Sequence, residues 1–195
     1  MSQAADRERA AEMARWLLSE GAVFLDTETT GLDSRDQICE IALVAADGVV
    51  LVDTLVRPSI RIPPSATAIH GISDADVAAA PRFEEVWPEV RRKLDDRHLI
   101  IYNAEYDTRM MFQTARPASR AEWSLPARSV ACAMKLYAQY HGAWNGARRS
   151  YAWQSLGNAI IQCAISLPAE IRLHRARADA ETTRLLLMHM AGQRV

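Results

Sequence analysis

The sequence AVFLDTETTG at residues 22–31 places two carboxylates directly behind a short apolar run. Residues 22–25 predict a buried strand. Because side chains at positions i and i+2 of a strand share a face, Asp26 and Glu28 should project together from its carboxyl end, where open α/β sheets bind ligands. Adjacent carboxylates repel unless a cation or a proton lies between them, and their oxygens suit Mg²⁺ or Mn²⁺. Taken alone, the pattern also fits a strand that ends in an acidic surface turn.

The remaining pattern predicts an α/β protein with three layers, α/β/α, around one mixed five-stranded sheet. The Asp47-Gly48 pair indicates a tight hairpin, so the first three strands should form an antiparallel meander. Trp16, Trp87 and Trp153 lie at helical spacing and are expected in the core. The predicted strands are 22–25, 38–46, 49–56, 98–102 and about 128–130; the predicted helices are 4–19, 81–96, 105–115, 131–140, 153–165 and 177–190; and 58–73 and 117–126 are predicted loops.

Length and composition fit one globular domain, expected at residues 21–195, with residues 1–20 as an N-terminal helical extension. The 195 residues are 49% hydrophobic and 24% charged, which excludes disorder as the main state. No apolar run approaches the ~20 residues of a membrane helix, and charged residues follow Met1, so a cytoplasmic protein is expected. The net charge of −1 neither indicates nor excludes a nucleic-acid partner. Three widely spaced cysteines predict reduced thiols and exclude a disulfide framework or a zinc knuckle.

Two further segments carry residues suited to catalysis. Asn103 precedes a predicted helix that it can cap, and Asp107 falls in the first turn of that helix. His174 precedes the last predicted helix, and Asp179 lies within its opening turns. Each segment alone also has an ordinary explanation, either a stabilising first-turn acid or a solvated, arginine-rich helix start.

Together the segments supply four carboxylates and one histidine, which is the set that two-metal phosphodiester hydrolysis requires. Two cations ~4 Å apart can clamp a scissile phosphate between the attacking and leaving oxygens. A histidine with a reference pKa of ~6.5 can accept the proton of the attacking water near neutral pH.

These segments resemble the DEDDh group of 3′–5′ exonucleases, the DnaQ-like proofreading type within the ribonuclease H-like fold. The resemblance runs from about Val23 to Leu187. Its three motifs correspond to residues 24–32 (FLDTETTGL), to residues 103–107 (NAEYD), and to His174 followed by Asp179; the stretch IHGI at 69–72 is also similar to the family. Three motifs in the family's order and spacing are far more specific than any one of them.

The resemblance implies roles for these residues. It implies that Asp26, Glu28, Asp107 and Asp179 hold two Mg²⁺ or Mn²⁺ ions, with Asp26 bridging both, and that His174 is the general base. It also implies substrate-binding residues: Thr29 and Leu32 contact the terminal nucleotide, with Leu32 wedged against its base, and the same pocket involves Ile69, His70, Tyr106 and Asn103. Ordinary core packing is the alternative for Leu32 and Tyr106, and a histidine satisfied by loop backbone is the alternative for His70.

The sequence departs from the family in three places. Tyr102 stands where members often carry histidine, and the N-terminal helix is not a usual part of the catalytic core. Because the sequence ends soon after the last predicted helix, we do not expect the polymerase-binding C-terminal tail of many proofreading subunits. The N-terminal helix could dock a polymerase or a second copy of the chain, or simply pack. Residues 141–151 interleave Trp144 and Tyr151 with two arginines, which suits a single strand or, alternatively, an ordinary surface loop. Arg175 and Arg177 are likewise expected to contact phosphates, with a solvated, arginine-rich helix start as the alternative.

The expected function is metal-dependent 3′–5′ hydrolysis of single-stranded or frayed DNA from its 3′ end, releasing nucleoside 5′-monophosphates. A 3′–5′ exoribonuclease is the alternative within the same chemistry, because contacts to a 2′-hydroxyl cannot be read from one sequence. A nucleic-acid-binding module without turnover is the alternative of another class, which the five competent catalytic positions disfavour.

Overall fold

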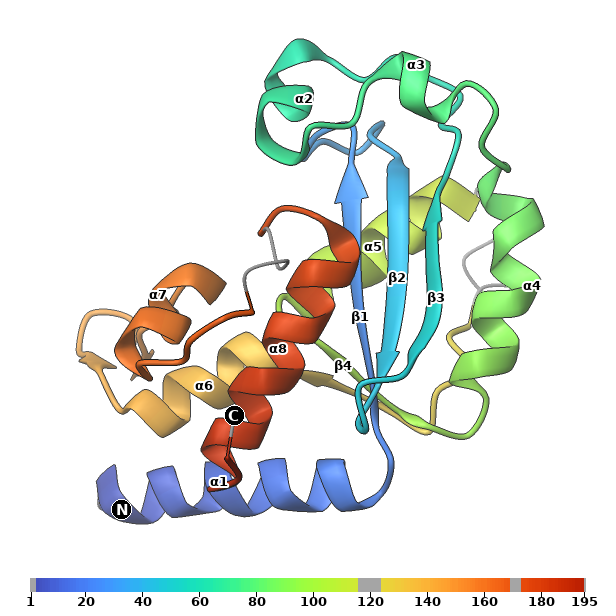
Figure 1. The fold of residues 1–195 in the computed structure, drawn as a ribbon. Coiled ribbons are helices and arrows are strands. Elements are labelled where there is room, and N and C mark those ends of the chain that lie inside the picture. Colours follow the sequence, from blue (N-terminus) through green and yellow to red (C-terminus); the bar gives the residue numbers. More distant parts are fainter. Residues whose placement is uncertain (1–2, 116–123, 169–172, 195) are drawn as a thin grey trace.

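A five-stranded mixed sheet forms the centre of the molecule (Figure 1). The computed structural model describes residues 3–115, 124–168 and 173–194. The strand order is β3-β2-β1-β4-β5; β1 pairs antiparallel with β2 and β2 with β3, whereas β4 pairs parallel with both β1 and β5. This confirms the predicted mixed sheet and its opening meander. The strands are β1 (Val23–Thr29), β2 (Ile38–Ala45), β3 (Val50–Leu55), β4 (His98–Ile101) and β5 (Ser129–Cys132).

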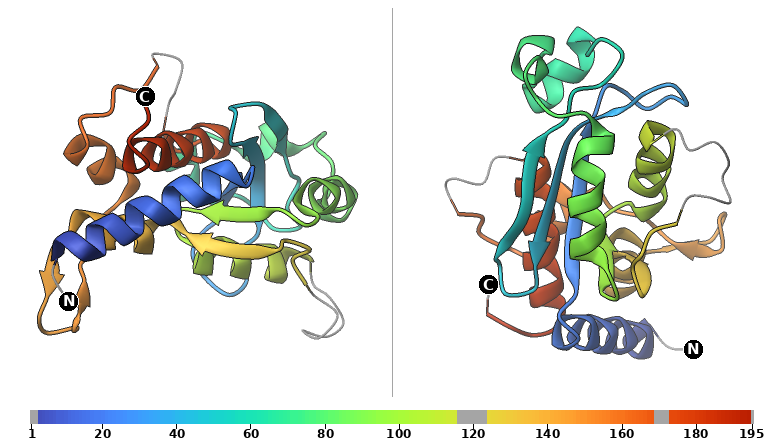
Figure 2. Two further views of the ribbon diagram at one scale, coloured as in Figure 1. Left: turned by 90° about the horizontal axis from the view of Figure 1, so that it is seen from below. Right: turned by 90° about the vertical axis from the view of Figure 1, so that its right-hand side faces the viewer.

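Helices cover both faces of this sheet and complete the three layers (Figures 1 and 2). One face packs against α1 (Gln3–Ser19), α6 (Ala133–His141), α7 (Leu156–Gln162) and α8 (Ala176–Met190), and the other against α4 (Phe83–Leu94) and α5 (Ala104–Ala115). Successive strand residues alternate between the two layers: Phe24 lies in the core under α8, and Leu25 in the core under α4 and α5. The strand parity of β1 therefore determines which layer each motif residue meets.

Short elements lie where the sequence predicted loops. The loop expected at 58–73 contains α2 (Pro64–His70), which Pro64 starts and Gly71 ends at a left-handed φ of 77°, and α3 (Asp74–Val77) follows it. The stretch 141–151 contains a two-stranded hairpin, β6 (Trp144–Asn145) and β7 (Ser150–Tyr151). Most of the loop predicted at 117–126 falls outside the described residues.

Some predicted boundaries and burials differ from the structure. The helix predicted to open at Pro81 begins at Phe83, and the one predicted at 153–165 covers only Leu156–Gln162. Trp153 consequently precedes the helix and is 56% exposed, and Trp16 is 45% exposed at the surface of α1, so the prediction of core positions for both was wrong. None of the helices among the described residues has the length and apolar character needed to span a membrane.

Candidate active site

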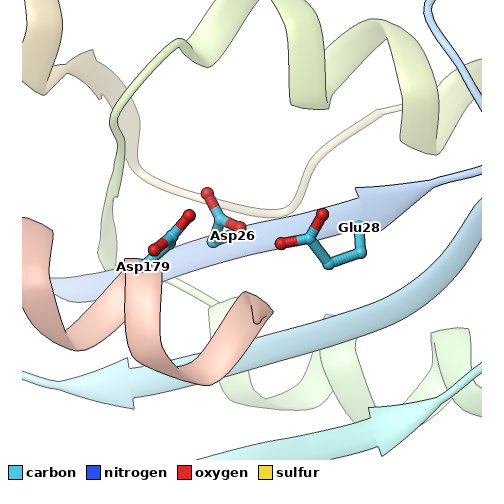
Figure 3. A group of neighbouring side chains, drawn as sticks. All are labelled: Asp26, Glu28 and Asp179. Atoms are coloured by element: carbon cyan, nitrogen blue, oxygen red, sulfur yellow. The ribbon is translucent and has the colours of Figure 1, made fainter. Parts of the chain in front are cut away.

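Three carboxylates from β1 and α8 meet above the middle of the sheet (Figure 3). Asp26 and Glu28 lie within β1 rather than beyond its end, and their side chains share the face that α8 covers. Asp179, in the first turn of α8, completes the group. One ligand atom from each of the three lies within 4.8 Å of the others, so a single divalent cation can reach all three.

Asp107 lies near this group but is not one of the three carboxylates that meet within 4.8 Å. It lies in the first turn of α5, is 3% exposed, and accepts a 2.7 Å hydrogen bond from the hydroxyl of Thr27. Thr27 lies between Asp26 and Glu28 on β1, so the hydrogen bond fixes the start of α5 against the strand that carries both carboxylates. The charge of Asp107 is among those that raise the pKa of Asp26 and of Glu28.

Burial and mutual repulsion hold these carboxyls partly protonated in the absence of a cation. Burial, followed by the neighbouring carboxylates, raises the pKa of Asp26 well above its ordinary value and that of Glu28 to about 8. Burial raises the pKa of Asp107 to about 7 and that of Asp179 to about 6. The backbone N–H and the charge of His174 lower the pKa of Asp179 and so offset part of this increase. A converging set of oxygen donors whose charges repel one another fits divalent cations, which replace the protons.

An ion pair between the buried Glu40 and the half-exposed Arg175 holds the start of α8 beside the cluster. Glu40 on β2 is 2% exposed and lies directly opposite Glu28 in the antiparallel register. Its carboxylate accepts hydrogen bonds of 3.0 and 3.1 Å from Nε of Arg175, a further one from Nη2, and one of 2.8 Å from the backbone N–H of Ala176. Both arginines that were expected to contact phosphates thus lie against carboxylates in this structure: Arg175 pairs with Glu40, and Arg177 lies 3.5 Å from Asp53.

His174 immediately precedes this ion pair. Its backbone has a left-handed φ of 65°, and its N–H lies 3.2 and 3.4 Å from the two carboxylate oxygens of Asp179. The side chain is exposed. A left-handed conformation is costly for a residue other than glycine, and the contacts of its neighbours maintain it here. The imidazole thus stands at the rim of the carboxylate cluster, open to water.

All the predicted nucleotide-contacting residues except Asn103 line one cleft of about 730 Å³ next to the cluster. Leu32 is 76% exposed and Ile69 60% exposed, so both present apolar surface to the cleft. The hydroxyls of Thr29 and Tyr106 share a 2.6 Å hydrogen bond, and each lies within hydrogen-bonding distance of the carbonyl of Gly31, at 2.9 and 3.0 Å. The cleft is lined by Thr27, Glu28, Thr29, Thr30, Gly31, Leu32, Asp33, Asp36, Pro63, Ser65, Ala66, Ile69, His70 and Tyr106.

Two of the predicted substrate-binding residues make backbone contacts. Nδ1 of His70 accepts from the N–H of Ile72 at 3.0 Å, so its Nε2 carries the proton and donates to the carbonyl of Thr29 at 3.2 Å. Burial lowers the pKa of this imidazole, which favours the neutral ring. The carbonyl of Asn103 accepts from the N–H groups of Tyr106 and Asp107 and begins α5, and Asn103 is not among the residues that line the cleft.

Sequence reasoning missed Glu40 and Thr27. Glu40 carried a detectable signal, because it is the one charged residue in the otherwise apolar run 38–46, and such a residue needs a buried partner. Thr27 carried none, since a threonine in a strand is ordinary.

Known proteins resemble this chain in sequence and in fold. A family model described as Exonuclease matches residues 23–187. The chain is 39% identical over 176 residues to "Uncharacterized exonuclease CP81" of Escherichia phage 186, covering 88% of this chain and 89% of that protein. It is 32% identical over 171 residues to "Exodeoxyribonuclease 10" of Escherichia coli K12, covering 84% of this chain and 66% of that protein.

A solved structure, "Exonuclease X in complex with 5′ overhanging duplex DNA", superposes with a TM-score of 0.61 at 28% identity and covers 89% of this chain and 94% of that one. The chain also matches 8 to 13% of the length of three bacterial proteins named for DNA polymerase III.

Proposed function

The chain belongs to the exonuclease family of the DnaQ-like, ribonuclease H-like type, and from this premise we propose that it removes nucleotides one at a time from the 3′ end of single-stranded DNA. The observation that carries the proposal is the convergence of Asp26, Glu28 and Asp179 within 4.8 Å beside the apolar cleft. Enzymes of this family depend on divalent metal ions, and we assign two Mg²⁺ or Mn²⁺ ions to Asp26, Glu28, Asp107 and Asp179.

In the proposed reaction, the cleft binds the terminal nucleotide, and the carboxylates next to the cleft would bind the divalent cations. Leu32 and Ile69 present apolar surface against which a base can stack, whatever its identity. When bound, the divalent cations supply positive charge that offsets the negative charge developing on the scissile phosphate. Asp26 and Glu28 would hold these cations from β1, and Asp179 would do so from the first turn of α8 (Figure 3).

His174 is the proposed proton acceptor. Its exposed imidazole takes the proton of the water that attacks phosphorus, while the bond to the 3′-oxygen of the preceding nucleotide breaks. The terminal nucleotide then leaves with its 5′-phosphate, and the departing 3′-oxygen takes a proton from solvent, so the shortened strand ends in a 3′-hydroxyl. The hydrogen bond from the His174 N–H to Asp179 ties the position of this base to one of the ligands.

Polarity, sugar preference and product can be measured in one time course. Oligonucleotides of DNA and of RNA, each labelled at the 5′ or at the 3′ end, are incubated with the protein and Mg²⁺. We expect a ladder of shortening fragments from the 5′-labelled DNA and immediate release of labelled mononucleotide from the 3′-labelled DNA. The reverse pattern would refute the polarity, and faster digestion of the RNA would show an exoribonuclease.

Two variants test the site itself. Asp26→Asn should abolish hydrolysis, whereas Asp95→Asn, at an exposed carboxylate just beyond α4, should leave it unchanged. His174→Ala should lose most of the rate while still binding Mn²⁺ in an equilibrium titration. Loss of Mn²⁺ binding in His174→Ala with an unchanged single-turnover rate would contradict its role as the base.

A further inference from the structure

The hairpin of residues 144–151, here the Trp–Arg hairpin, exposes an aromatic ring and two cations together. Trp144 is 61% exposed and packs edge-to-face on Tyr151, with ring centroids 5.3 Å apart. Arg148 and Arg149 occupy the turn between the two strands, and both are exposed. Among the ion pairs of the described residues, none includes either arginine. The hairpin therefore offers a flat apolar face beside unneutralised positive charge.

The N-terminal helix fixes this hairpin in place. The hydroxyl of Tyr151 donates to the carboxylate of Asp6 on α1 at 2.6 Å, and the side-chain amide of Gln3 donates to the carbonyl of Gly142 at 2.8 Å. Figure 2 shows the hairpin beside the N-terminal end of α1. A two-stranded ribbon this short is not stable alone, so α1 supplies the contacts that order it. The helix therefore supports the half-buried Tyr151, on which the exposed Trp144 packs.

The chain that leaves the hairpin returns to the catalytic end of the sheet. Strands β1 and β4 are parallel, with Leu25 paired with Ile101, so the next residues, Asp26 and Tyr102, lie side by side. The hydroxyl of Tyr102 donates to the carbonyl of Gln154 at 3.0 Å. The segment that follows the hairpin is therefore held next to the strand end beside Asp26. Trp153 on this segment is 56% exposed and is a second exposed aromatic ring close to the hairpin in sequence.

We propose that the Trp–Arg hairpin is a second contact surface for single-stranded DNA, which binds the strand upstream of the nucleotide held in the cleft. This proposal rests on the proposed function, because it concerns the same substrate. Bases stack on exposed aromatic rings irrespective of sequence, and arginines contact the intervening phosphates. Charge complementarity favours a polyanion over a protein partner, since two arginines stand on this small surface without an acidic neighbour paired to them.

Binding is measured by fluorescence anisotropy in EDTA, with 5′-labelled oligothymidylates of three and of about twenty nucleotides. Trp144→Ala should weaken binding of the long strand about five- to tenfold, because one stacking contact is lost. Arg148→Ala/Arg149→Ala should also lower the slope of log Kd against log salt by about 1 for the long strand. The matched control Arg91→Ala/Arg97→Ala removes two exposed arginines on and just beyond α4 and should change neither quantity.

The short strand separates this surface from the catalytic site. With Mg²⁺, kcat/KM for the trinucleotide should stay unchanged in all these variants, while kcat/KM for the long strand falls by the same factor as its binding. Tyr151→Phe, which keeps the ring but removes the hydrogen bond to Asp6, should give a smaller loss in the same direction.

Two outcomes would overturn the proposal. In the first, the hairpin variants bind the long strand as tightly as the unchanged protein does, and the hairpin would then serve another kind of partner. In the second, the variants lose the same factor in kcat/KM on the short strand as on the long one. Failure of the proposed function would look different, because nuclease activity would then be missing from the unaltered protein whatever the binding in EDTA.

Discussion

Replacing Asp26 by asparagine should make the metal-free protein more stable while removing its activity. Asp26 lies against Glu28, Asp107 and Asp179, and burial together with these charges raises its pKa well above the ordinary 3.8. An asparagine keeps the shape of the side chain and carries no charge to repel its neighbours. The carboxylate that we place at the centre of the site therefore costs stability in the absence of a cation.

The magnitude follows from proton linkage. Because the pKa of Asp26 is raised in the folded state, the stability linked to its protonation is fully present below the unfolded pKa of 3.8 and is lost as pH rises towards the folded pKa. One extra proton on the folded chain lowers the free energy of unfolding by about 1.4 kcal/mol per pH unit. From pH 3.8 to pH 7 the loss has an upper limit of about 4 kcal/mol, and asparagine escapes all of it.

Urea unfolding in EDTA at several pH values between about 4.5 and 8 measures this difference. The two proteins should be similar at the acidic end, and the advantage of Asp26→Asn should grow as pH rises. Mg²⁺ should then narrow the gap, because it stabilises only the protein that binds it well. Asp95→Asn is the control and should track the unchanged protein. A variant that is less stable at every pH, or a gap independent of pH, would refute the reasoning.

Three further changes test other contacts. Arg175→Ala leaves the Glu40 carboxylate buried beside the cluster without its cation, so we expect a loss of about 2–3 kcal/mol in urea unfolding, largely restored by adding Glu40→Gln; an unaffected single variant would contradict the clamp. Leu32→Ala should change the free energy of unfolding by less than about 0.5 kcal/mol because the side chain is exposed, yet it should raise KM for single-stranded DNA severalfold in steady-state assays. An unchanged KM would show that Leu32 does not contact the substrate. His174→Gly should relieve the left-handed backbone and stabilise the fold by about 1 kcal/mol in urea unfolding while slowing hydrolysis; a destabilised variant would show that the imidazole supports the fold.

The sheet could be predicted from the sequence because its information is local. Apolar runs end at turn residues, and the Asp47-Gly48 pair joins β2 to β3 with Gly48 at a φ of 88°. The short elements lack such information. Helix α2 begins at the second of two prolines and has only seven residues, and β6 and β7 have two each, so no period can develop in them. Their existence depends on packing contacts, such as the hydrogen bond from Tyr151 to Asp6.

The site was predictable to different extents. Strand parity alone placed Asp26 and Glu28 on one face, and this is confirmed by their position in β1. Asp107 and Asp179 were candidates as acidic residues at the starts of predicted helices, but only the family resemblance grouped them with Asp26 and Glu28, since nothing local indicates that α5 and α8 meet β1. The contacts of Glu40 required the register of β1 with β2, which no local pattern encodes.

The register of β1 with β2 explains how the start of α8, which carries His174 and Asp179, is positioned beside Asp26 and Glu28 on β1. Because Glu40 lies opposite Glu28, its carboxylate is fixed at the same height along the sheet as the cluster. It holds both the guanidinium of Arg175 and the N–H of Ala176, so the first residue of α8 is set at that height as well. One helical turn further on, Asp179 then faces β1, and one residue before the ion pair His174 stands at the rim. A buried glutamate outside the proposed ligand set thus determines where the last ligand and the proposed base lie. We therefore expect Glu40→Gln to lower the rate of hydrolysis in steady-state assays, although Glu40 is not one of the proposed ligands.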